Sequence, residues 1–424
     1  MSAMKAFVLL PVLKNKISAL RTPEERMEEA IRLTCSIGLE VVEKRLVFLR
    51  EIKPQTYIGG GVVQELFNQI QSENIEVLIA DCALSPLQQR NLEKALKCKV
   101  IDRTALILEI FGQRARTKEG ALQVEVAHLT YQRSRLVRSW THLERQRGGT
   151  GFLGGPGEKQ IEMDRRLIDE KLVRLKKELE NVKKTRSLQR VKRQKVPFPV
   201  VALVGYTNAG KSTLFNALTH ADVYAKDQLF ATLDPTIRQV ELPSGQKILL
   251  SDTVGFISEL PTELVAAFRA TLEEVLQADV LLHIRDASSS QKEAQKKDVE
   301  EVLKSLGLKE EVEAGLNEVY NKIDLVDDME AKTLKGYALR KENILCVSAL
   351  TGEGLKDILS FLDKILAVSW IDTEILIRPE EGKELAWLYE HGRVETRLDT
   401  EEGICLKVKL RPEDIKKLEK RKYL

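Results

Sequence analysis

The sequence predicts a multidomain α/β protein that contains one region of long paired helices. With 424 residues, the chain is long enough for about three domains of roughly 150 residues each. In two stretches, short runs rich in β-branched residues alternate with helical patterns, which is typical of parallel βα units. Between them, apolar residues recur every seven positions, as in two helices that pack along each other. We therefore expect a parallel α/β domain, a helical hairpin, a second α/β domain and a small C-terminal domain.

The composition narrows the classes of protein to consider. Charged residues make up 31% of the chain, against an ordinary share of about 25%, so long solvated helix faces are expected. Aromatic residues make up only 5%, which disfavours a nucleic-acid platform built on base stacking. The formal net charge of +3 is too small to indicate a partner.

Cysteine usage and hydropathy favour a cytoplasmic protein. The five cysteines are scattered and lack a CxxC spacing, which argues against a disulfide framework and a zinc site and favours a reducing compartment. No run of about 18 apolar residues occurs, so no membrane insertion is expected. The apolar start at residues 6–13 is interrupted by Pro11 and followed by no cleavage site, so a buried strand is favoured over an export signal.

Residues 1–117 are predicted to form the first α/β domain. The strand candidates are residues 7–13, 40–48, 77–80 and 100–101. Gly59, Gly60 and Gly61 precede a predicted helix over residues 62–70, and their backbone amides can hold an anion. The spacing of a phosphate fingerprint is missing, so a plain tight turn is the favoured interpretation.

Residues 118–196 are predicted to form a helical hairpin. Two apolar stripes follow the seven-residue spacing: Leu122, Val126, Leu129, Leu136, Trp140 and Leu143 in the first helix, and Ile161, Ile168, Leu172, Leu175, Leu179 and Val182 in the second. Such stripes pack together when one helix turns back on the other. They can also pair between two chains, so the oligomeric state stays open, with a monomer preferred.

The hairpin carries a glycine-rich loop and a strong positive charge. The loop, residues 148–157, holds Phe152 and Leu153 at its centre, and these side chains face water unless a partner covers them. A flexible linker and an exposed functional loop are the two interpretations. Residues 131–195 hold 19 Lys and Arg against 8 Asp and Glu. A polyanionic partner and a solvated helix face account for this bias equally well.

A nucleotide site is predicted at the start of the second α/β domain, residues 197–370. The sequence GYTNAGKS fits the pattern G-x-x-x-x-G-K-S and lies between an apolar strand, residues 200–204, and a helix, residues 213–218. Backbone amides of this turn can wrap phosphates, Lys211 adds positive charge, and the Ser212 hydroxyl can bind Mg²⁺. The residues expected to bind the phosphates are Gly205, Tyr206, Thr207, Asn208, Ala209, Gly210, Lys211, Ser212 and Thr213.

Three further segments make the predicted site selective for GTP and GDP. Asp252 ends a strand and can hold the hydration shell of the magnesium ion, while the Gly255 amide reaches toward the γ-phosphate. Asp324, in the sequence NKID, can accept both hydrogens from N1 and the exocyclic amine of guanine, a pairing that adenine does not offer. The complete set is Asp252, Thr253, Val254, Gly255, Asn321, Lys322, Asp324, Ser348 and Ala349.

The segment over residues 230–236 is expected to respond to the γ-phosphate. Thr232 or Thr236 can offer magnesium a second hydroxyl ligand, and the spacing does not choose between them. The contacts to GTP expected here come from Phe230, Ala231, Thr232, Leu233 and Asp234.

Residues 371–424 are predicted to form a small α+β domain, for which the sequence indicates no function. Its expected elements are a strand over 374–377, a helix over 380–391, strands over 394–398 and 404–410, and a helix over 412–420.

The motifs of the second α/β domain, taken together, resemble those of the HflX family of ribosome-associated GTPases. They are GYTNAGKST, QLFATLDPT, DTVGFI with LPTELVAAFRATLEE, and NKID. The segments DCALSPLQQRNLEKAL, VIDRTALILEIFGQRART and WTHLERQRGGTGFLGGPGEKQIEMDRR are similar to the N-terminal half of that family. The resemblance implies a Ras-like P-loop GTPase domain and the hydrolysis of GTP to GDP and phosphate. It also implies that Thr232 is the metal-ligating threonine.

The resemblance also implies partners. The family binds the large ribosomal subunit and ribosomal RNA and dissociates stalled or stress-inactivated ribosomes, which would place the tip of the loop near the peptidyl-transferase centre. Arg133, Arg135 and Arg138 of the basic hairpin are then expected to contact ribosomal RNA. Family members are also described as hydrolysing ATP through the N-terminal region, although no P-loop there supports this.

The expected mechanism departs from the Ras pattern at one position. Ras-like enzymes carry a glutamine directly after the DxxG glycine, and it orients the attacking water, whereas this chain has Phe256 there. We therefore expect slow intrinsic hydrolysis that waits for a partner. No catalytic residue is assigned, although Lys211 and Asn208 are candidates for stabilising charge. In the alternative interpretation, Phe256 packs on the switch helix and the backbone places the water.

Asn208 is a second residue that is expected to influence catalysis, through the binding of a monovalent cation. An asparagine two residues before the last glycine of the loop is similar to the arrangement in potassium-activated GTPases, where its oxygen helps to bind K⁺ beside the phosphates. Such a cation supplies charge that an arginine otherwise provides. An amide that only stabilises the loop is the other interpretation.

Three functions are thus considered. The expected one is a GTPase that acts on ribosomes. The alternatives are a regulatory GTPase timer that acts on an acidic protein partner, and an RNA-remodelling enzyme driven by ATP in the N-terminal domain. If the hairpin docks against the switch segments, the nucleotide state would orient its loop.

Overall fold

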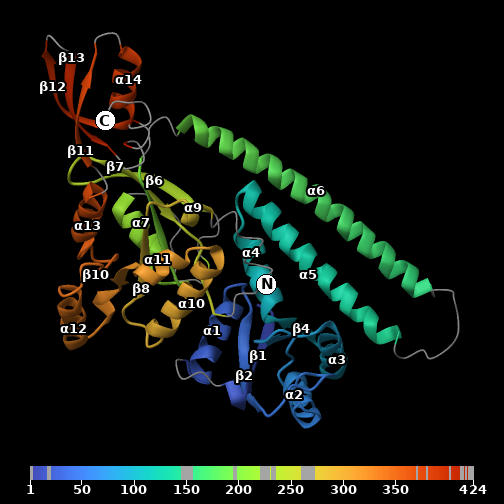
Figure 1. Cartoon of the computed structure of the whole chain (residues 1–424). Coiled ribbons are helices and arrows are strands. Elements are labelled where there is room, and N and C mark those ends of the chain that lie inside the picture. The colour runs from blue at the N-terminus through green and yellow to red at the C-terminus, as the bar shows by residue number, and fades with distance from the viewer. Residues whose placement is uncertain are drawn as a thin grey trace.

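The computed structural model describes residues 3–16, 21–144, 156–193, 198–219, 230, 235–258, 273–368, 371–378, 381–400, 403–410, 415 and 418. Figure 1 shows four parts: a blue N-terminal domain, two long helices beside it, a central domain, and a red C-terminal domain at the opposite end. The predicted mixed α/β class is confirmed. Among the described residues, every helix is too short or too polar to cross a lipid bilayer.

The N-terminal domain is built on four parallel strands in the order β2, β1, β3, β4. Their bounds are β1 (Lys5–Leu13), β2 (Glu40–Leu49), β3 (Val77–Ala80) and β4 (Lys99–Asp102). The predicted strands are confirmed, each with at most two further residues at either end. β1 and β3 are apolar and buried because helices cover both faces of the sheet.

Successive side chains of β1 pack into two separate hydrophobic cores, one on each face of the sheet. Val8 and Leu10 pack with Met27 of one helix layer, while Phe7 and Leu9 pack with the other layer, as the period of two in a strand requires. The helical segments are η1 (Lys14–Lys16), α1 (Pro23–Cys35), α2 (Gly60–Ser72), α3 (Pro86–Leu96) and α4 (Arg103–Arg114). α1 and α4 lie on the face that turns toward the central domain.

The three consecutive glycines start a helix instead of making a separate turn. Gly59 is the N-cap of α2, and Gly60 and Gly61 lie in its first turn. None of the three has a positive φ angle, so the tight turn favoured from the sequence is replaced by an early helix start.

The predicted helical hairpin consists of α5 (Lys118–Glu144) and α6 (Pro156–Arg193), which run side by side in opposite directions (Figure 1). Leu122, Leu129, Leu172 and Leu175 are buried between them, so the seven-residue spacing did predict the contact face. α6 begins at Pro156, a residue well suited to the first turn of a helix, so the connecting loop ends two residues earlier than expected. Residues 148–155 of the loop lie outside the described residues.

α5 is anchored to the N-terminal domain, where it packs against α3 and α4. The Tyr131 hydroxyl donates to Asp102 Oδ1 at 2.7 Å, and Arg135 donates to Asp102 Oδ2 at 2.5 Å. Asp102 also caps α4, because it accepts from the Ala105 amide at 2.9 Å. One carboxylate therefore holds the start of α4 and the middle of α5 together.

The central domain contains a six-stranded sheet in the order β10, β9, β8, β5, β7, β6, in which β6 alone runs antiparallel to its neighbour. The strands are β5 (Val200–Gly205), β6 (Thr236–Glu241), β7 (Lys247–Asp252), β8 (Val280–Asp286), β9 (Asn317–Asn321) and β10 (Ile344–Cys346). The helical segments are α7 (Lys211–Thr219), α9 (Glu273–Leu276), α10 (Lys292–Leu306), α11 (Lys309–Ala314), η2 (Ile323–Leu325), α12 (Asp328–Ala338) and α13 (Leu355–Val368). Because β5 lies between β7 and β8, the loops after these strands meet at one edge, where open α/β sheets bind ligands.

The C-terminal part forms a three-stranded antiparallel sheet in the order β11, β13, β12. Its elements are β11 (Ile371–Ile377), α14 (Gly382–His391), β12 (Arg393–Thr400) and β13 (Gly403–Leu410). One face of the sheet packs on α14 through Leu388, Leu406 and Val408. Most of the expected last helix lies outside the described residues.

Candidate functional site

The P-loop follows β5 and has a shape that only glycine permits at two positions. At Gly210, which has a φ of +86°, a Cβ atom would lie 2.2 Å from Asn321 Nδ2. At Gly205, it would lie 2.3 Å from the Ile284 carbonyl oxygen. The loop therefore lies against β8 and the NKID segment, and its backbone can approach a phosphate closely.

Lys211 begins α7 and is buried under the loop. Its Nζ donates to the carbonyls of Gly205 at 3.1 Å and Tyr206 at 2.8 Å. Burial lowers the pKa of Lys211 to about 8, while the Asp252 charge acts in the opposite direction. A buried ammonium group that forms no ion pair with the described residues, next to a loop of backbone amides, fits the phosphates of a nucleotide.

This lowered pKa predicts a pH dependence of nucleotide binding. In the free protein, Lys211 loses its proton above about pH 8, whereas the phosphates favour the charged form, so the affinity for GDP should fall about tenfold between pH 7 and pH 9. Titration with fluorescent GDP at constant ionic strength measures the effect. The Lys211→Arg variant keeps its charge and should give a flat profile over this range. An equally flat wild-type profile would contradict the prediction.

Two oxygen groups that suit magnesium lie together. The Ser212 hydroxyl donates to Asp252 Oδ2 at 2.7 Å, and Asp252 lies opposite Leu203 in the pairing of β5 with β7. A hydroxyl and a carboxylate are hard oxygen ligands, so this donor set fits Mg²⁺ held against the phosphates. Of the two threonines proposed for the switch, Thr236 lies opposite Asp252 in the β6–β7 pairing. Thr232 lies outside the described residues, as do Ala231, Leu233 and Asp234.

The segments proposed for guanine recognition are braced against the P-loop. Asn321 Nδ2 donates to the Ala209 carbonyl at 3.0 Å, and the Ala349 amide donates to Asn321 Oδ1, also at 3.0 Å. Lys322 Nζ pairs with Asp286 at 2.8 Å. Asp324 is exposed and makes no hydrogen bond or ion pair within the described part of the chain, so its carboxylate is available for a base.

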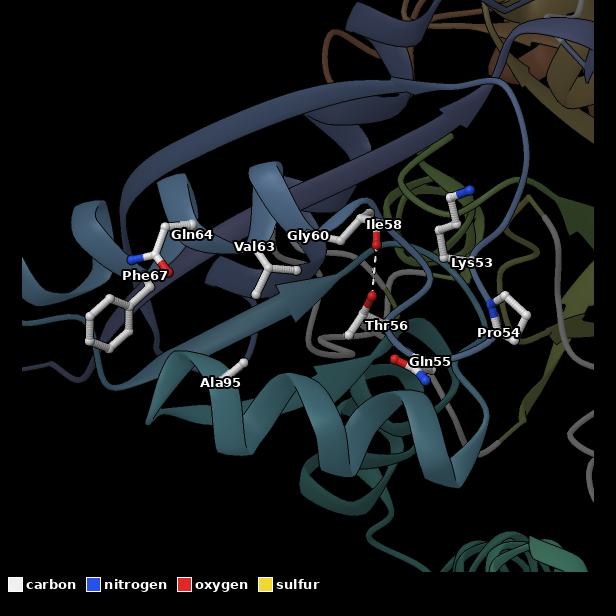
Figure 2. A pocket seen from close by; sticks show the side chains of 10 residues that line it. All are labelled: Lys53, Pro54, Gln55, Thr56, Ile58, Gly60, Val63, Gln64, Phe67 and Ala95. Carbon is white, nitrogen blue, oxygen red and sulfur yellow. Dashed lines mark hydrogen bonds between the residues drawn. The ribbon is translucent and has the colours of Figure 1, made fainter.

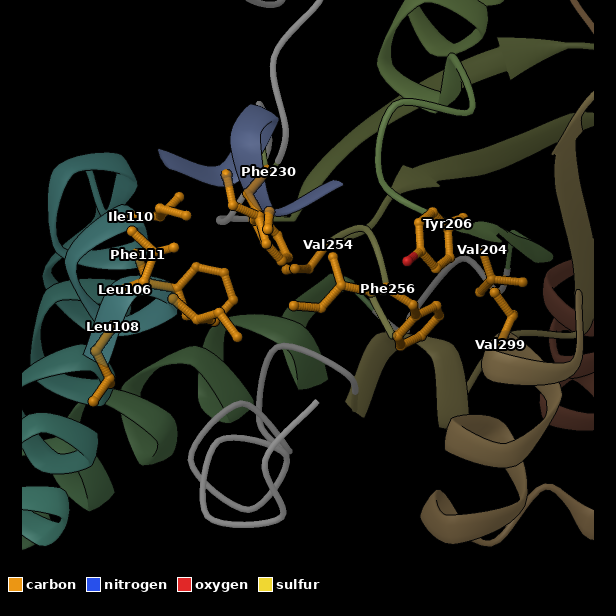
Figure 3. Close-up of a cluster of buried hydrophobic side chains, with 14 of the residues drawn as sticks. Leu106, Leu108, Ile110, Phe111, Val204, Tyr206, Phe230, Val254, Phe256 and Val299 are labelled. Atoms are coloured by element: carbon orange, nitrogen blue, oxygen red, sulfur yellow. The ribbon is translucent and has the colours of Figure 1, made fainter. Parts of the chain in front are cut away.

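Some residues proposed to bind GTP turn their side chains elsewhere. Figure 3 shows Tyr206, Phe230 and Val254 in the same apolar cluster as Phe111 of α4. Any contact of these three residues with a nucleotide must therefore use the backbone. Other predicted site residues have internal roles: the buried Thr253 hydroxyl donates to the Leu203 carbonyl, and the Ser348 hydroxyl accepts from the Thr351 amide.

Phe256 belongs to this cluster as well, and its side chain is 2% exposed. Its carbonyl accepts from the Thr207 amide at 2.7 Å, and its amide donates to the Gly205 carbonyl at 3.1 Å. The residue after the DxxG glycine is thus paired to the P-loop through its backbone, while its ring packs near Val299. Its ring is not placed to orient water.

The N-terminal domain contacts two segments, at Phe230 and at Tyr206 with Ser258, that adjoin residues proposed to bind the γ-phosphate. The ring of Phe111 meets the ring of Phe230 edge-on, with 4.7 Å between centroids. On the other side, Glu29 of α1 accepts from the Tyr206 hydroxyl at 2.6 Å and from Ser258 Oγ at 2.8 Å. The sequence did not predict these contacts, since nothing in its local pattern distinguishes Glu29 or Ser258.

A buried ionic cluster lies at this domain contact. Arg103 donates to Asp81, to Glu29 and to the Ser258 carbonyl at 2.5, 2.5 and 2.9 Å. Burial alone would raise the pKa of Glu29, but the Arg103 charge and the hydrogen bonds from Tyr206 and Arg103 hold it below its usual value. Burial raises the pKa of Asp81 despite the same arginine. The cluster joins α1, the residue that follows β3 and the start of α4 to the segment that follows Gly255.

The N-terminal domain also contains a cavity of about 530 Å³, beside α2 (Figure 2). Its lining includes Lys53, Gln55, Gly60, Gln64 and Phe67, and no carboxylate among the residues that the structure describes. Lys53 is paired with Glu51 at 2.5 Å. This lining offers no carboxylate ligand for a magnesium ion, and its one cation already has a partner, so its chemistry does not favour a triphosphate.

Four family models match successive parts of the chain. They are described as "GTP-binding GTPase N-terminal" over residues 24–112, "GTP-binding GTPase Middle Region" over 114–193, "50S ribosome-binding GTPase" over 200–322 and "HflX C-terminal domain" over 333–423. Together they match most of the chain.

Individual relatives are similar over almost their whole length. The chain is 50% identical to "GTPase HflX" of Magnetococcus marinus, over 96% of this chain and 92% of the relative. It is 43% identical to "GTPase HflX" of Escherichia coli, over 91% and 90% of the two chains. Among solved structures, a GTP-binding protein from Sulfolobus solfataricus in complex with GDP matches with a TM-score of 0.44 and 24% identity, over 86% of this chain and 99% of that one.

Proposed function

Because this chain belongs to the HflX family of GTPases, we propose that it binds the large ribosomal subunit and uses GTP to dissociate stalled or inactive ribosomes. The observation that carries the proposal is that one protein combines a P-loop site, with Lys211, Ser212 and Asp252 in place, and a long basic hairpin. The match of residues 200–322 to a model described as "50S ribosome-binding GTPase" supports the same partner. A cytoplasmic location and a monomeric state follow as parts of this proposal.

The direct test is subunit separation followed by light scattering or sedimentation. Ribosomes should separate with GTP or a non-hydrolysable analogue, and should remain joined with GDP or without nucleotide. Co-sedimentation with large subunits should follow the same order. If the protein bound GTP and still left ribosomes joined in every nucleotide state, a regulatory timer on a protein partner would be favoured instead.

The contact with ribosomal RNA is proposed for α6 rather than for α5. Arg135 is held by Asp102, and Arg133 pairs with Asp169 at 3.0 Å, so both expected RNA contacts are engaged within the chain. The side chain of Arg138 lies outside the described residues. On α6, the exposed basic side chains include Lys176 and Lys177, which have no ion pair among the described residues.

Replacing both Lys176 and Lys177 by glutamate should weaken binding to large subunits about tenfold. The slope of log affinity against log salt concentration should also fall, as expected when about two fewer counterions are released on binding. GTP affinity should stay unchanged, because both lysines belong to α6 and not to the domain that carries the P-loop. Arg90→Glu with Lys94→Glu on α3 is the matched control for a change of net charge. Equal subunit affinity for wild type and the α6 variant at several salt concentrations would remove α6 as the RNA contact.

The nucleotide signal reaches the hairpin through α4. Phe111 contacts Phe230 and shares one apolar cluster with Val124 and Ala127 of α5. A γ-phosphate that orders the segment after Phe230 therefore acts on α4 first and on α5 second. The coupling to the hairpin is proposed to run through the N-terminal domain, because α5 packs against α3 and α4.

Two narrower proposals concern further ligands. K⁺ would bind beside Asn208 and replace the charge of an arginine, and equal hydrolysis rates in sodium and potassium buffers would remove this proposal. ATP hydrolysis in the N-terminal domain, which the lining of the cavity beside α2 does not favour, would survive a Lys211→Ala change. If that variant lost all ATP turnover, the hydrolysis of ATP would be assigned to the P-loop.

A further inference from the structure

We propose that Arg32, on α1 of the N-terminal domain, reaches the γ-phosphate of GTP in the P-loop and stabilises the charge that develops during hydrolysis. In other P-loop GTPases, the guanidinium group of such an arginine stabilises the negative charge on the phosphoryl group during its transfer. The arginine comes from the same chain in some enzymes and from a partner protein in others. The proposal rests on GTP hydrolysis by the central domain and adds a catalytic residue from another domain.

A cavity at the seam between α1 and the P-loop carries this inference. Its volume is about 260 Å³, and Glu25, Glu28 and Arg32 of α1 face Thr207, Asn208 and Asp286 across it. The packing of Tyr206 against Glu29, joined by a 2.6 Å hydrogen bond, fixes the two walls relative to each other. Arg32 therefore lines the same cavity as Thr207 and Asn208, the two loop residues that precede Ala209.

The loop wall of this cavity belongs to the γ-phosphate end of the nucleotide site. A Cβ atom built on Gly255 would lie 2.8 Å from the Cγ2 atom of Thr207 and 3.1 Å from Lys211 Nζ. The DxxG glycine, the P-loop and its lysine thus converge at Thr207, and in P-loop enzymes these groups surround the γ-phosphate. Thr207 is 6% exposed, and its Oγ1 has no hydrogen-bond partner within the described residues.

Most charged groups around the cavity already have partners. Glu25 accepts from the Thr22 amide at 2.9 Å and from Ser290 Oγ at 2.8 Å. Glu29 is bound by Arg103, and Asp286 by Lys322. The side chain of Arg32 makes no hydrogen bond or ion pair in the part of the chain that the structure describes, while its backbone carbonyl accepts from the Ser36 amide at 3.1 Å. It is therefore the cation in the cavity wall that remains available to an anion.

The described P-loop site lacks a polar side chain at the position after the DxxG glycine, so a cation such as Arg32 would add a function that the site does not have. Phe256 replaces the usual water-orienting glutamine, and its ring is turned into the apolar cluster. Glu28 lies one helical turn before Arg32 on the same face of α1. Its negative charge repels phosphate, so the approach of the γ-phosphate to this wall depends on Arg32.

The test compares Arg32→Ala and Arg32→Lys with wild type in the full chain. Single-turnover hydrolysis, with and without ribosomes, should fall about a hundredfold in Arg32→Ala, as for the loss of one charge-stabilising donor. Affinity for fluorescent GDP should stay within about twofold, because the arginine acts at the γ-phosphate. The complex of GDP with aluminium fluoride, which imitates the transferring phosphoryl group, should no longer form. Arg32→Lys should restore part of both signals, since it keeps the charge but not the planar guanidinium.

Arg90→Ala, an exposed arginine on α3, serves as the matched control and should behave like wild type. Melting temperatures report any change in folding. Wild-type rates and a wild-type aluminium fluoride complex in Arg32→Ala would overturn the proposal. If instead Glu28→Gln abolished stimulation by potassium while Arg32→Ala had no effect, the cavity would hold a cation beside Asn208. A wild-type protein that binds GDP but never hydrolyses GTP would overturn the GTPase assignment itself, and the role of Arg32 with it.

Discussion

Replacing Asp324 by asparagine is expected to move the nucleotide preference from guanine to xanthine. The carboxylate accepts two hydrogens from guanine, whereas an asparagine amide presents a donor where guanine also presents one. Sites built to pair with a polar group reject a mismatched base strongly, so GTP affinity should fall roughly a thousandfold while XTP affinity rises. Competition of GTP, XTP and ATP against a fluorescent nucleotide measures both changes.

The structure makes this substitution a clean test. Asp324 is exposed in η2 and makes no hydrogen bond or ion pair with the described residues, so its replacement should leave the melting temperature of the free protein unchanged. Asp328→Asn, which removes an exposed acid at the start of α12, is the control. Unchanged GTP affinity in Asp324→Asn would show that the base is recognised elsewhere and would undo the guanine assignment.

Replacing Arg103 by methionine is expected to give the largest loss of stability. Arg103 is buried and neutralises Glu29 and Asp81, which are also buried. Removing one partner of a buried ion pair leaves an uncompensated charge and costs about 3–5 kcal/mol of unfolding free energy. Denaturant unfolding at pH 7.5 measures the loss, and Arg90→Met provides the exposed control. A change below about 1 kcal/mol would mean that the cluster is solvated.

The pH dependence of this variant has a definite sign. In wild type, the pKa of Glu29 is lowered, so its contribution to stability is present above the ordinary carboxyl pKa and is lost as the pH falls through the folded value. Without Arg103, burial raises the pKa of both Glu29 and Asp81, and the folded state then gains protons more readily than the unfolded state. The stability gap between variant and wild type should therefore narrow between pH 7.5 and pH 5. A gap that widens over this range would contradict the proposed charge balance.

The P-loop and its companion motifs could be recognised from the sequence because each depends on a few neighbouring residues. Gly210 and Lys211 are specified by a strand, a tight loop and a helix start within one short segment. The contact face of the hairpin was predictable for a similar reason, since a seven-residue spacing in each helix places Leu122 and Leu172 at one interface. The start of α2 differed, because three glycines carry no signal that separates a turn from a helix cap.

Local sequence thus determined the fold class, the nucleotide-binding motifs and the paired helices of this protein. Tertiary structure alone decided which surfaces face those motifs. The hydrogen bonds of Ser258 with Glu29 and with Arg103 span 229 and 155 residues of sequence, and neither residue stands out in a helical or strand period. Arg135, one basic residue among many in the sequence, proved to be an internal anchor for the same reason. Periodicity and spacing report on neighbours along the chain, whereas buried charge pairs form between residues that only folding brings together.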